Sequence, residues 1–322
     1  MDASRESIER PRTVVALGGN AIIRRADAGT IEQQAERAAE AMRGIADLAQ
    51  AGHVLVLTHG NGPVVGNILL RSEAARELVP PMPLYIAGAD SGGGVGYLLQ
   101  QTLHNELVSR GLTRQVATLV TQTVVDSADP AFSTPTKPIG PFMSQDDALA
   151  HAEERGWTVR EQPGGGWRRV VPSPLPVEIV ESSAIRMLAE TGTIVIAAGG
   201  GGVPVTRDDD GHLAGVDAVV DKDWTGALLA CALGADTFVV LMEADALYRG
   251  WGTPDEQRVE TLTAAEASAL LCSGALDTGT IGPKLAASAY AAQTCGCTSV
   301  LCSPGQLAQA MVGEAGTRVT SG

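Results

Sequence analysis

Three apolar segments rich in β-branched residues each end in a glycine-rich turn, and this repeated pattern limits the folds that the chain can adopt. The units are 13–17 followed by Gly18-Gly19-Asn20, 54–57 followed by Thr58-His59-Gly60-Asn61-Gly62, and 194–197 followed by 199–202. Helical patterns, such as 31–51 with its terminal Gly52, separate the apolar segments. Strands that alternate with helices predict an α/β fold with a largely parallel sheet and helices on both faces.

The glycine-rich turns also indicate where a ligand binds. In an open parallel sheet, ligands bind beyond the carboxyl ends of the strands. Glycines at these ends, among them Gly18, Gly60, Gly200 and Gly201, let backbone N–H groups approach phosphate oxygens because no Cβ stands in the way. One such turn is common at any corner between a strand and a helix, but three in one chain favour a phosphate-binding site.

Lysine is rare in this chain, and its positions support the same interpretation. Only Lys137, Lys222 and Lys284 are lysines among the 23 lysine and arginine residues. They stand beside prolines or aspartates rather than on amphipathic helix faces. An ammonium is a compact point charge, whereas a guanidinium is a wide planar fork. Three lysines kept in an arginine-rich chain therefore predict a cluster of small cations that handles phosphate.

The rest of the chain is expected to form one domain with an inserted excursion. Residues 97–110, entered through Gly92-Gly93-Gly94, predict a helix, and 115–125 predict a single long strand. Prolines and tryptophans become frequent at 126–176, where we expect a small protruding lid that carries Lys137. Further helices are expected at 185–190, 224–233 and 285–294, further strands at 238–242 and 298–301, and a hairpin tip at 208–211. Residues 1–322 are thus predicted to be a single domain.

Composition and charge narrow the possible partners. The net charge of −14 over 322 residues disfavours a general binder of nucleic acid or of acidic membranes. The first twelve residues are charged and no apolar run reaches about 18 residues, so we expect a soluble cytoplasmic protein. Cys295, Cys297 and Cys302 lack the spacing and the histidine partners of a zinc site. We expect reduced thiols in the core.

Motifs of other enzyme classes are missing, and the lack of a base is informative. The sequence has no P-loop, no dinucleotide fingerprint, no zinc-binding helix and no nucleophile elbow with a triad. It also offers no convincing general base. A kinase acting on an alcohol needs one, whereas a carboxylate or carbamate acceptor is already anionic. Lysines, backbone donors and Mg²⁺ would offset the repulsion between two anionic substrates.

Four aspartates near strand ends or turns are candidate site residues, namely Asp217, Asp221, Asp223 and Asp245. Asp223 follows Lys222 directly and is the natural partner for orienting its ammonium. The other three either belong to the site or act as helix caps and solvent-exposed acids. His59 is either catalytic or holds its loop by a hydrogen bond, and we favour the second role.

Six segments closely resemble the carbamate kinases of the amino acid kinase family. They are VVALGGN (14–20), HGNGP (59–63), TPTKPIGP (134–141), GWRRVVPSP (166–174), GGGGVPV (199–205) and VVDKD (219–223). The resemblance extends over nearly the whole chain. TPTKPIGP and GWRRVVPSP are the most specific, because they separate the carbamate kinases from other members of the family.

The resemblance implies a three-layer αβα sandwich with a mainly parallel central sheet, a small protruding subdomain and a homodimer. It implies reversible phosphoryl transfer between ATP and carbamate, with carbamoyl phosphate and ADP on the other side of the reaction. Mg²⁺ would be carried by the nucleotide rather than by a site of the protein. No nucleic acid or membrane partner is implied.

The resemblance also assigns roles to residues. Lys137 matches the lysine of the protruding subdomain that reaches the acceptor or the phosphoryl group, Lys222 and Lys284 match a pair that clamps the transferring phosphate, and Asp223 matches the acid that organises them. The loop residues fall into a phosphate side (Gly18, Gly19 and Asn20), an acceptor side (Gly60, Asn61 and Gly62) and a nucleotide-base region (Glu243, Asp245 and Tyr248).

Four positions depart from the family pattern, at Val64, Gly92, Met242 and Thr280. The first two replace polar residues near the acceptor and motivate an alternative, a kinase of another small carboxylate or carbamate-like acid. A second alternative is an inactive nucleotide-binding regulator on the same fold. Retention of all three lysines argues against that regulator, because a simple binder could have drifted to arginine.

Overall fold

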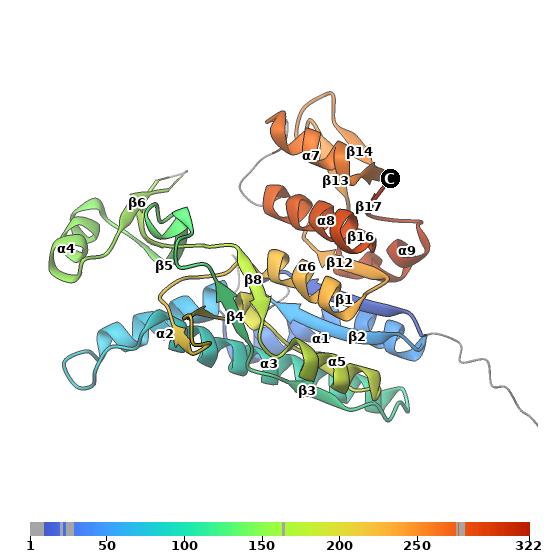
Figure 1. The fold of residues 1–322 in the computed structure, drawn as a ribbon, viewed down its shortest axis with the longest axis horizontal. Helices are drawn as coiled ribbons and strands as arrows, with labels where there is room; N and C mark the ends of the chain where they lie inside the picture. Colours follow the sequence, from blue (N-terminus) through green and yellow to red (C-terminus); the bar gives the residue numbers. More distant parts are fainter. Residues whose placement is uncertain (1–9, 20–21, 24–28, 163–164, 275, 277–280) are drawn as a thin grey trace, which may run out of the picture.

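The central feature of the computed structural model is an eight-stranded sheet (Figure 1). The structure describes residues 10–19, 22–23, 29–162, 165–274, 276 and 281–322. The strand order is β15-β17-β16-β12-β1-β2-β9-β3, and neighbours are parallel except for β16 and β17. In chain order these strands are β1 (Arg12–Leu17), β2 (Val54–His59), β3 (Val116–Thr118), β9 (Ile194–Ile196), β12 (Thr237–Leu241), β15 (Thr261–Thr263), β16 (Thr298–Cys302) and β17 (Thr317–Thr320).

Helices cover both faces of this sheet, which confirms the predicted α/β class. One face packs against α1 (Ile31–Gln50), α3 (Leu84–Ser109) and α9 (Leu307–Val312), and the other against α5 (Ser182–Glu190), α6 (Lys222–Leu233), α7 (Ala264–Cys272) and α8 (Ile281–Cys295). Side chains alternate along a strand, so Val15 and Leu17 of β1 enter the first core while Val14 and Ala16 enter the second. The central strands are therefore buried on both sides.

A second sheet lies beside the first and corrects one prediction. Its order is β11-β10-β4-β8, with β4 (Gln122–Val125), β8 (Pro176–Ile179), β10 (Val203–Arg207) and β11 (Leu213–Gly215). The predicted single strand over 115–125 is wrong, because the chain leaves the main sheet after β3 and enters the second sheet as β4. Between them, the Thr121 hydroxyl donates to the carbonyl of Leu119 and accepts from the N–H of Ala198, both at 2.9 Å. The hairpin predicted at 208–211 is present between β10 and β11.

The excursion forms a small unit of its own at the left of Figure 1. Its three-stranded antiparallel sheet has the order β5-β7-β6 and is accompanied by α4. The elements are β5 (Lys137–Met143), α4 (Gln145–Arg155), β6 (Val159–Glu161) and β7 (Trp167–Val171). The Ser144 hydroxyl accepts from the N–H of Asp147 and caps α4. Helix α2 (Gly62–Ala74) lies next to this unit and contacts β5 through Val65 and Ile139.

Two further predictions are wrong. Helix α3 begins at Leu84, well before residue 97, and the glycines expected to precede it lie inside it. The expectation of reduced thiols fails for Cys295, because it forms a disulfide with Cys231 of α6. Cys297 and Cys302 are buried free thiols.

The remaining elements are the two-stranded sheet of β13 (Leu247–Arg249) and β14 (Gln257–Val259), and the short helices η2 (Pro130–Phe132), η3 (Gly199–Gly201) and η4 (Pro304–Gln306). Across the described part of the chain, no helix combines the length and apolar character needed to cross a membrane.

Candidate active site

The site lies where four adjacent strands of the main sheet end. Strands β12, β1, β2 and β9 are neighbours and parallel, so their carboxyl ends meet at one edge. The predicted glycine turns follow β1, β2 and β9 at this edge. The fold therefore places all three of them side by side, as expected for a ligand site beyond the ends of parallel strands.

Close contacts between the turns explain why they contain glycine. A Cβ on Gly60 would lie 2.9 Å from the backbone nitrogen of Gly19 and 3.4 Å from the Lys222 side chain. A Cβ on Gly200, whose φ is +68°, would lie 2.1 Å from the side-chain nitrogen of Asn61. A Cβ on Gly201 would collide with the Val220 carbonyl at 2.1 Å. The three turns and the start of α6 thus fit together only without these side chains.

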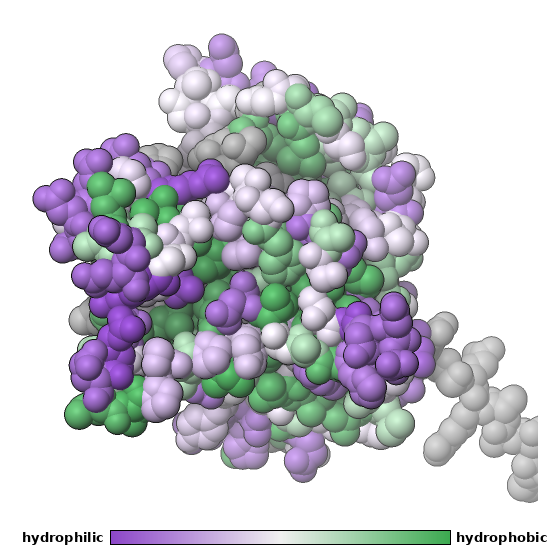
Figure 2. Space-filling view, turned by 60° about the vertical axis from the view of Figure 1, so that its left-hand side comes forward, coloured by the Kyte–Doolittle hydropathy of each residue, from purple (hydrophilic) through white to green (hydrophobic). Residues whose placement is uncertain are grey.

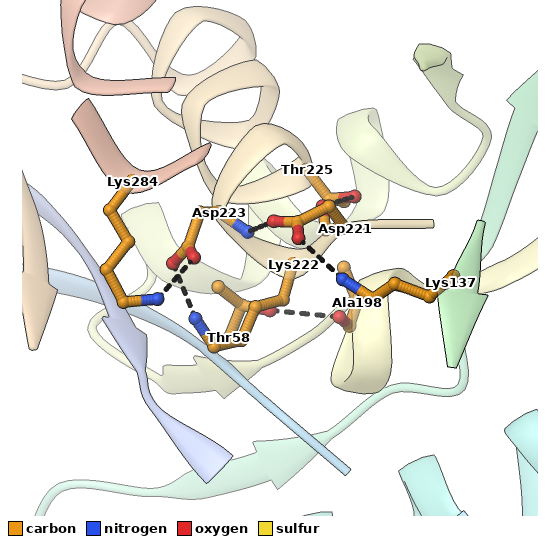
Figure 3. Close-up of polar contacts among 8 residues, drawn as sticks. All are labelled: Thr58, Lys137, Ala198, Asp221, Lys222, Asp223, Thr225 and Lys284. Carbon is orange, nitrogen blue, oxygen red and sulfur yellow. Dashed lines mark hydrogen bonds and ion pairs between the residues drawn. The ribbon is translucent and has the colours of Figure 1, made fainter. Parts of the chain in front are cut away.

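The first turn of α6 carries the central charged cluster (Figure 3). The ammonium of Lys222 donates to one carboxylate oxygen of Asp223 at 2.5 Å, and the ammonium of Lys284 donates to the other at 2.8 Å. The Asp223 side chain is only 3% exposed, and the two lysines are 12% and 18% exposed. Lys284 comes from the first turn of α8, so two helices present their lysines to one buried carboxylate.

Lys137 of the excursion joins the same region through Asp221. Its ammonium donates to Asp221 at 3.0 Å, and the other Asp221 oxygen accepts from the N–H of Asp223 at 2.9 Å and caps α6. Asp221 therefore has both roles considered for it, helix cap and site residue. The structure brings all three lysines of the chain into one connected network of five residues (Figure 3).

The charges in the network shift each other's protonation equilibria. Burial lowers the pKa of Lys222, and the adjacent Lys284 ammonium adds to this effect against the opposing pull of Asp223. Burial also acts to lower the pKa of Lys284, but the Asp223 carboxylate outweighs it and the net shift is upward. The lysines Lys137 and Lys222 overcome burial at Asp221 and lower its pKa to about 2. Lys284 and Asp221 are therefore charged at neutral pH.

His59 is placed to hold its loop. Its side chain is fully buried, and its Nδ1 contacts the carbonyl oxygen of Gly60 at 3.1 Å. Burial lowers its pKa to about 4, so the ring is neutral at neutral pH. A Cβ on Gly199 would lie 2.5 Å from Nε2, which shows how tightly the next turn packs on the ring.

Several polar residues of the site were not found from the sequence. The Thr58 hydroxyl donates to the carbonyl of Ala198, the positive-φ residue that begins the third turn, at 2.9 Å. The Thr225 hydroxyl donates to the carbonyl of Gly201 at 3.1 Å. Ser91 was also missed; its hydroxyl accepts at 2.7 Å from the amide of Asn61, which the sequence did predict. A single polar residue in an apolar stretch, such as Thr225 in α6, is the signal that could have revealed them.

The other predicted residues lie as follows. Gly18 follows β1 and faces the end of β12, since a Cβ there would lie 3.2 Å from the Leu241 carbonyl. Asp217 accepts from the N–H groups of Leu84 and Tyr85 and so caps α3. Of the two roles considered for it, site residue or helix cap, the structure shows the helix cap.

In the predicted nucleotide-base region, Glu243 follows β12 and is exposed. The Tyr248 hydroxyl lies within hydrogen-bond distance of both carboxylate oxygens of Asp245, at 3.0 and 3.1 Å. Gly62 begins α2. Asn20 and Thr280 lie outside the described residues.

Comparison with known proteins places this arrangement in a family. A model of the amino acid kinase family matches residues 11–303. The chain belongs to the amino acid kinase family. Among its relatives, carbamate kinase of Halobacterium salinarum is 46% identical over 311 residues, covering 95% of this chain and 97% of that protein. Carbamate kinase of Thermococcus kodakarensis is 44% identical over 311 residues, covering 96% of this chain and 98% of that protein.

Solved structures agree with the sequence comparison. Carbamate kinase from Giardia lamblia bound to AMP-PNP matches with a TM-score of 0.91 at 38% identity, covering 97% of this chain and 99% of that one. The resemblance found in the six motifs is therefore confirmed, and the chain is a kinase with the three-layer fold of these enzymes.

Proposed function

We propose that this kinase transfers a phosphoryl group reversibly between ATP and carbamate. The observation that carries the proposal is the Lys222–Asp223–Lys284 cluster beside the glycine turns. Relatives of 42–46% identity over nearly the whole chain bear the name carbamate kinase. The cluster and the names of these relatives both support a site for two anionic substrates.

The charge balance of the network favours anions. Three lysines and two aspartates give it a formal net charge of +1, in a chain whose formal net charge is −14. The ammonium groups are held in place before substrate binds, so little reorganisation is needed when negative charge moves between donor and acceptor. We assign Lys222 and Lys284 to the transferring phosphoryl group, and Asp223 to keeping both ammonium groups in position.

Carbamate suits a site without a general base. His59 is neutral and packed against two turns, and the carboxylates of Asp221 and Asp223 are occupied by lysines. An alcohol acceptor would need one of them to remove a proton, whereas carbamate attacks as an anion. What the site must supply is relief from the repulsion between carbamate and nucleotide, and the lysines supply it.

Mg²⁺ fits this scheme as part of the nucleotide substrate. The carboxylates of the network that would otherwise ligate it are already paired with ammonium groups. The nucleotide phosphates are then the ligands that remain for the ion, and when bound it neutralises part of their charge. The turns after β1 and β9 offer backbone N–H groups to the same phosphates.

The excursion at 126–176 is proposed to act as a lid on the acceptor side. It carries Lys137 on β5, and the Lys137–Asp221 ion pair is its link to the cluster. Lys137 is 38% exposed, far more than the other two lysines, which fits a group that moves between Asp221 and the substrate. As the resemblance implies, we also propose a homodimer, to be tested by light scattering.

The function is tested by following ATP formation from Mg·ADP and fresh carbamoyl phosphate by phosphorus NMR, with acetyl phosphate in a parallel reaction. Rapid ATP formation from carbamoyl phosphate is expected, with Lys222→Arg and Lys284→Arg each at least about 100-fold slower in kcat, or about 2.7 kcal/mol. ATP formation only from acetyl phosphate would instead favour the kinase of another acid. Nucleotide binding without turnover of either compound would favour the regulator.

A further inference from the structure

A cavity of about 210 Å³ lies between helix α2 and the excursion, and none of the three lysines lines it. It has room for at least about seven waters, at ~30 Å³ for each. The wall on the α2 side includes Leu69 and Leu70, and the wall on the other side is formed by β5, α4 and β7. It lies at the boundary between α2 and the excursion, next to the small hydrophobic cluster that joins them.

The lining of the cavity is largely apolar. Besides the leucines of α2, it includes Met82, Ile139, Met143 and the ring of Trp157. On this side of the molecule hydrophobic residues lie in small patches between hydrophilic ones, without a broad hydrophobic face (Figure 2). A concave, mostly apolar pocket with a limited set of polar groups is the usual character of a small-molecule site rather than of a docking surface for a protein.

The polar groups at the cavity leave one cation without an ion-pair partner. Both carboxylates are engaged: Glu73 lies 2.7 Å from a nitrogen of Arg155 and 3.0 Å from one of Arg76, and Asp147 accepts from the Ser144 hydroxyl. Arg169 instead stacks on Trp157, 4.8 Å from the ring centroid. Within the described part of the chain, no oxygen accepts a hydrogen bond from its guanidinium and no carboxylate lies within 4 Å of it.

Two further groups at the cavity lack hydrogen-bond partners. The Nδ1 of His151 and the Nε and Nη1 of Arg155 are buried and have no hydrogen-bond partner among the described residues, although Nη1 lies in an ion pair with Glu73. The His151 ring packs against the same Trp157 ring with the centroids 4.8 Å apart and the planes tilted by 54°. Buried polar atoms in proteins are nearly always satisfied by protein, water or ligand, so the partners of these groups are expected inside the cavity.

We propose that this cavity binds a small organic anion with an apolar body, its acidic group on Arg169 and its body against Trp157 and the leucines of α2. The guanidinium provides a planar pair of donors that matches a carboxylate. Burial lowers the pKa of Arg169 while Asp217 and Glu73 act to raise it, so a bound anion would recover part of the solvation that burial removes. The proposal does not depend on the identity of the phosphoryl acceptor.

The test uses 3-phenylpropionate as the probe and the full-length protein without nucleotide or carbamoyl phosphate. Binding is measured by isothermal titration calorimetry, and its place by the indole N–H resonance of Trp157 in ¹⁵N NMR, assigned with Trp157→Phe. We expect saturable binding that shifts the Trp157 resonance. The uncharged 3-phenylpropionamide is expected to bind at least about tenfold more weakly, because it cannot form the ion pair.

Variants separate this site from nonspecific binding. Arg169→Met keeps the length of the side chain and should weaken the probe at least about tenfold. Arg160→Met is the matched control, because this exposed arginine lies on the same small sheet away from the cavity. Leu69→Trp, which fills the cavity, should abolish binding while the thermal transition stays cooperative.

Absence of saturable binding to the wild type, equal affinity in Arg169→Met, or a shift confined to other tryptophans would overturn the proposal. ATP formation from carbamoyl phosphate is measured on the same preparations. Failure of the probe to bind an active enzyme therefore counts against the cavity site alone, and binding to an inactive enzyme counts against the proposed function alone.

Discussion

Asp223→Asn tests whether one buried carboxylate holds the cluster together. The substitution keeps the size of the side chain and removes its charge, so two ammonium groups that are 12% and 18% exposed lose their common partner. The two ammonium groups contact different oxygens of Asp223, and in the amide one of these oxygens is replaced by an NH2 group, which is a donor and cannot accept from an ammonium. The other ammonium then remains largely buried without an anion.

The expected cost follows from the geometry. At an effective dielectric constant of 20, each ion pair near contact distance is worth about 4 kcal/mol before desolvation is subtracted. Removing one partner of a buried pair typically costs about 3–5 kcal/mol, because the other charge stays buried and unpaired. Asp223 serves two lysines, so we expect the free energy of unfolding to fall by about 3–5 kcal/mol, together with loss of turnover.

Urea denaturation followed by circular dichroism measures this loss through the shift of the midpoint at constant m-value. Asp208→Asn is the control, because it removes the same charge from an exposed hairpin tip and should shift the midpoint much less than Asp223→Asn does. The double variant Asp223→Asn, Lys284→Met removes one of the stranded ammonium groups as well. It should regain at least about 1 kcal/mol relative to Asp223→Asn alone.

A loss below about 1 kcal/mol in Asp223→Asn, with the m-value unchanged, would refute the reasoning. It would mean that water reaches both ammonium groups and that the cluster is not the buried network that the structure shows. Absence of coupling in the double variant would lead to the same conclusion by an independent route.

Three further predictions concern other parts of the molecule. The pKa of Asp221 in the folded protein, about 2, lies below its ordinary value of 3.8, so the charged carboxylate adds about 2 kcal/mol to the free energy of unfolding above pH 4. This contribution is lost as the pH falls towards 2. Urea denaturation at a series of pH values should therefore show the unfolding free energies of wild type and Asp221→Asn converging over that range. Replacing Cys231 and Cys295 by alanine should lower the unfolding free energy by up to about 4 kcal/mol, since the bond spans 64 residues, and an unchanged midpoint would show that the two thiols are not bonded. Gly200→Ala should reduce kcat/KM more than tenfold, whereas Gly111→Ala, at a similar φ of +71° but with nothing within 4 Å of its Cβ, should leave it within about twofold.

Helix α3 shows why part of the fold escaped prediction. Three consecutive glycines normally interrupt a helix, and the sequence was interpreted in that way. In the structure, Gly96 lies where β3 comes close, since a Cβ there would lie 2.3 Å from the Thr118 side chain, and Gly92 is in van der Waals range of the third turn, with a Cβ 3.5 Å from the Gly199 carbonyl; a Cβ on Gly93 or Gly94 would meet nothing within 4 Å. Packing against β3 and the third turn has overridden local propensity, and only the tertiary structure contains that packing.

The chain's passage from β3 to β4 escaped prediction for a related reason. An apolar, β-branched run is compatible with one strand or two, because residue type does not specify the hydrogen-bonding partner. Here the partner changes from β9 to β10 and β8 within a few residues, and the Thr121 hydroxyl satisfies the backbone at the change. The Cys231–Cys295 bond was likewise not predicted, since it depends on how the ends of α6 and α8 approach each other.

By itself the sequence determined the α/β class, the glycine turns at the ends of β1, β2 and β9, and the three lysines as residues to examine. These features are local: they depend on side-chain periodicity, on the freedom of glycine, and on the chemistry of one residue type. The tertiary structure alone decided that Lys222 and Lys284 share Asp223 and that Lys137 of the excursion is paired with Asp221 at the start of α6. It also decided that a cavity lies between the excursion and α2. Distances between residues far apart in the chain are set by the packing of whole elements, which no short segment encodes.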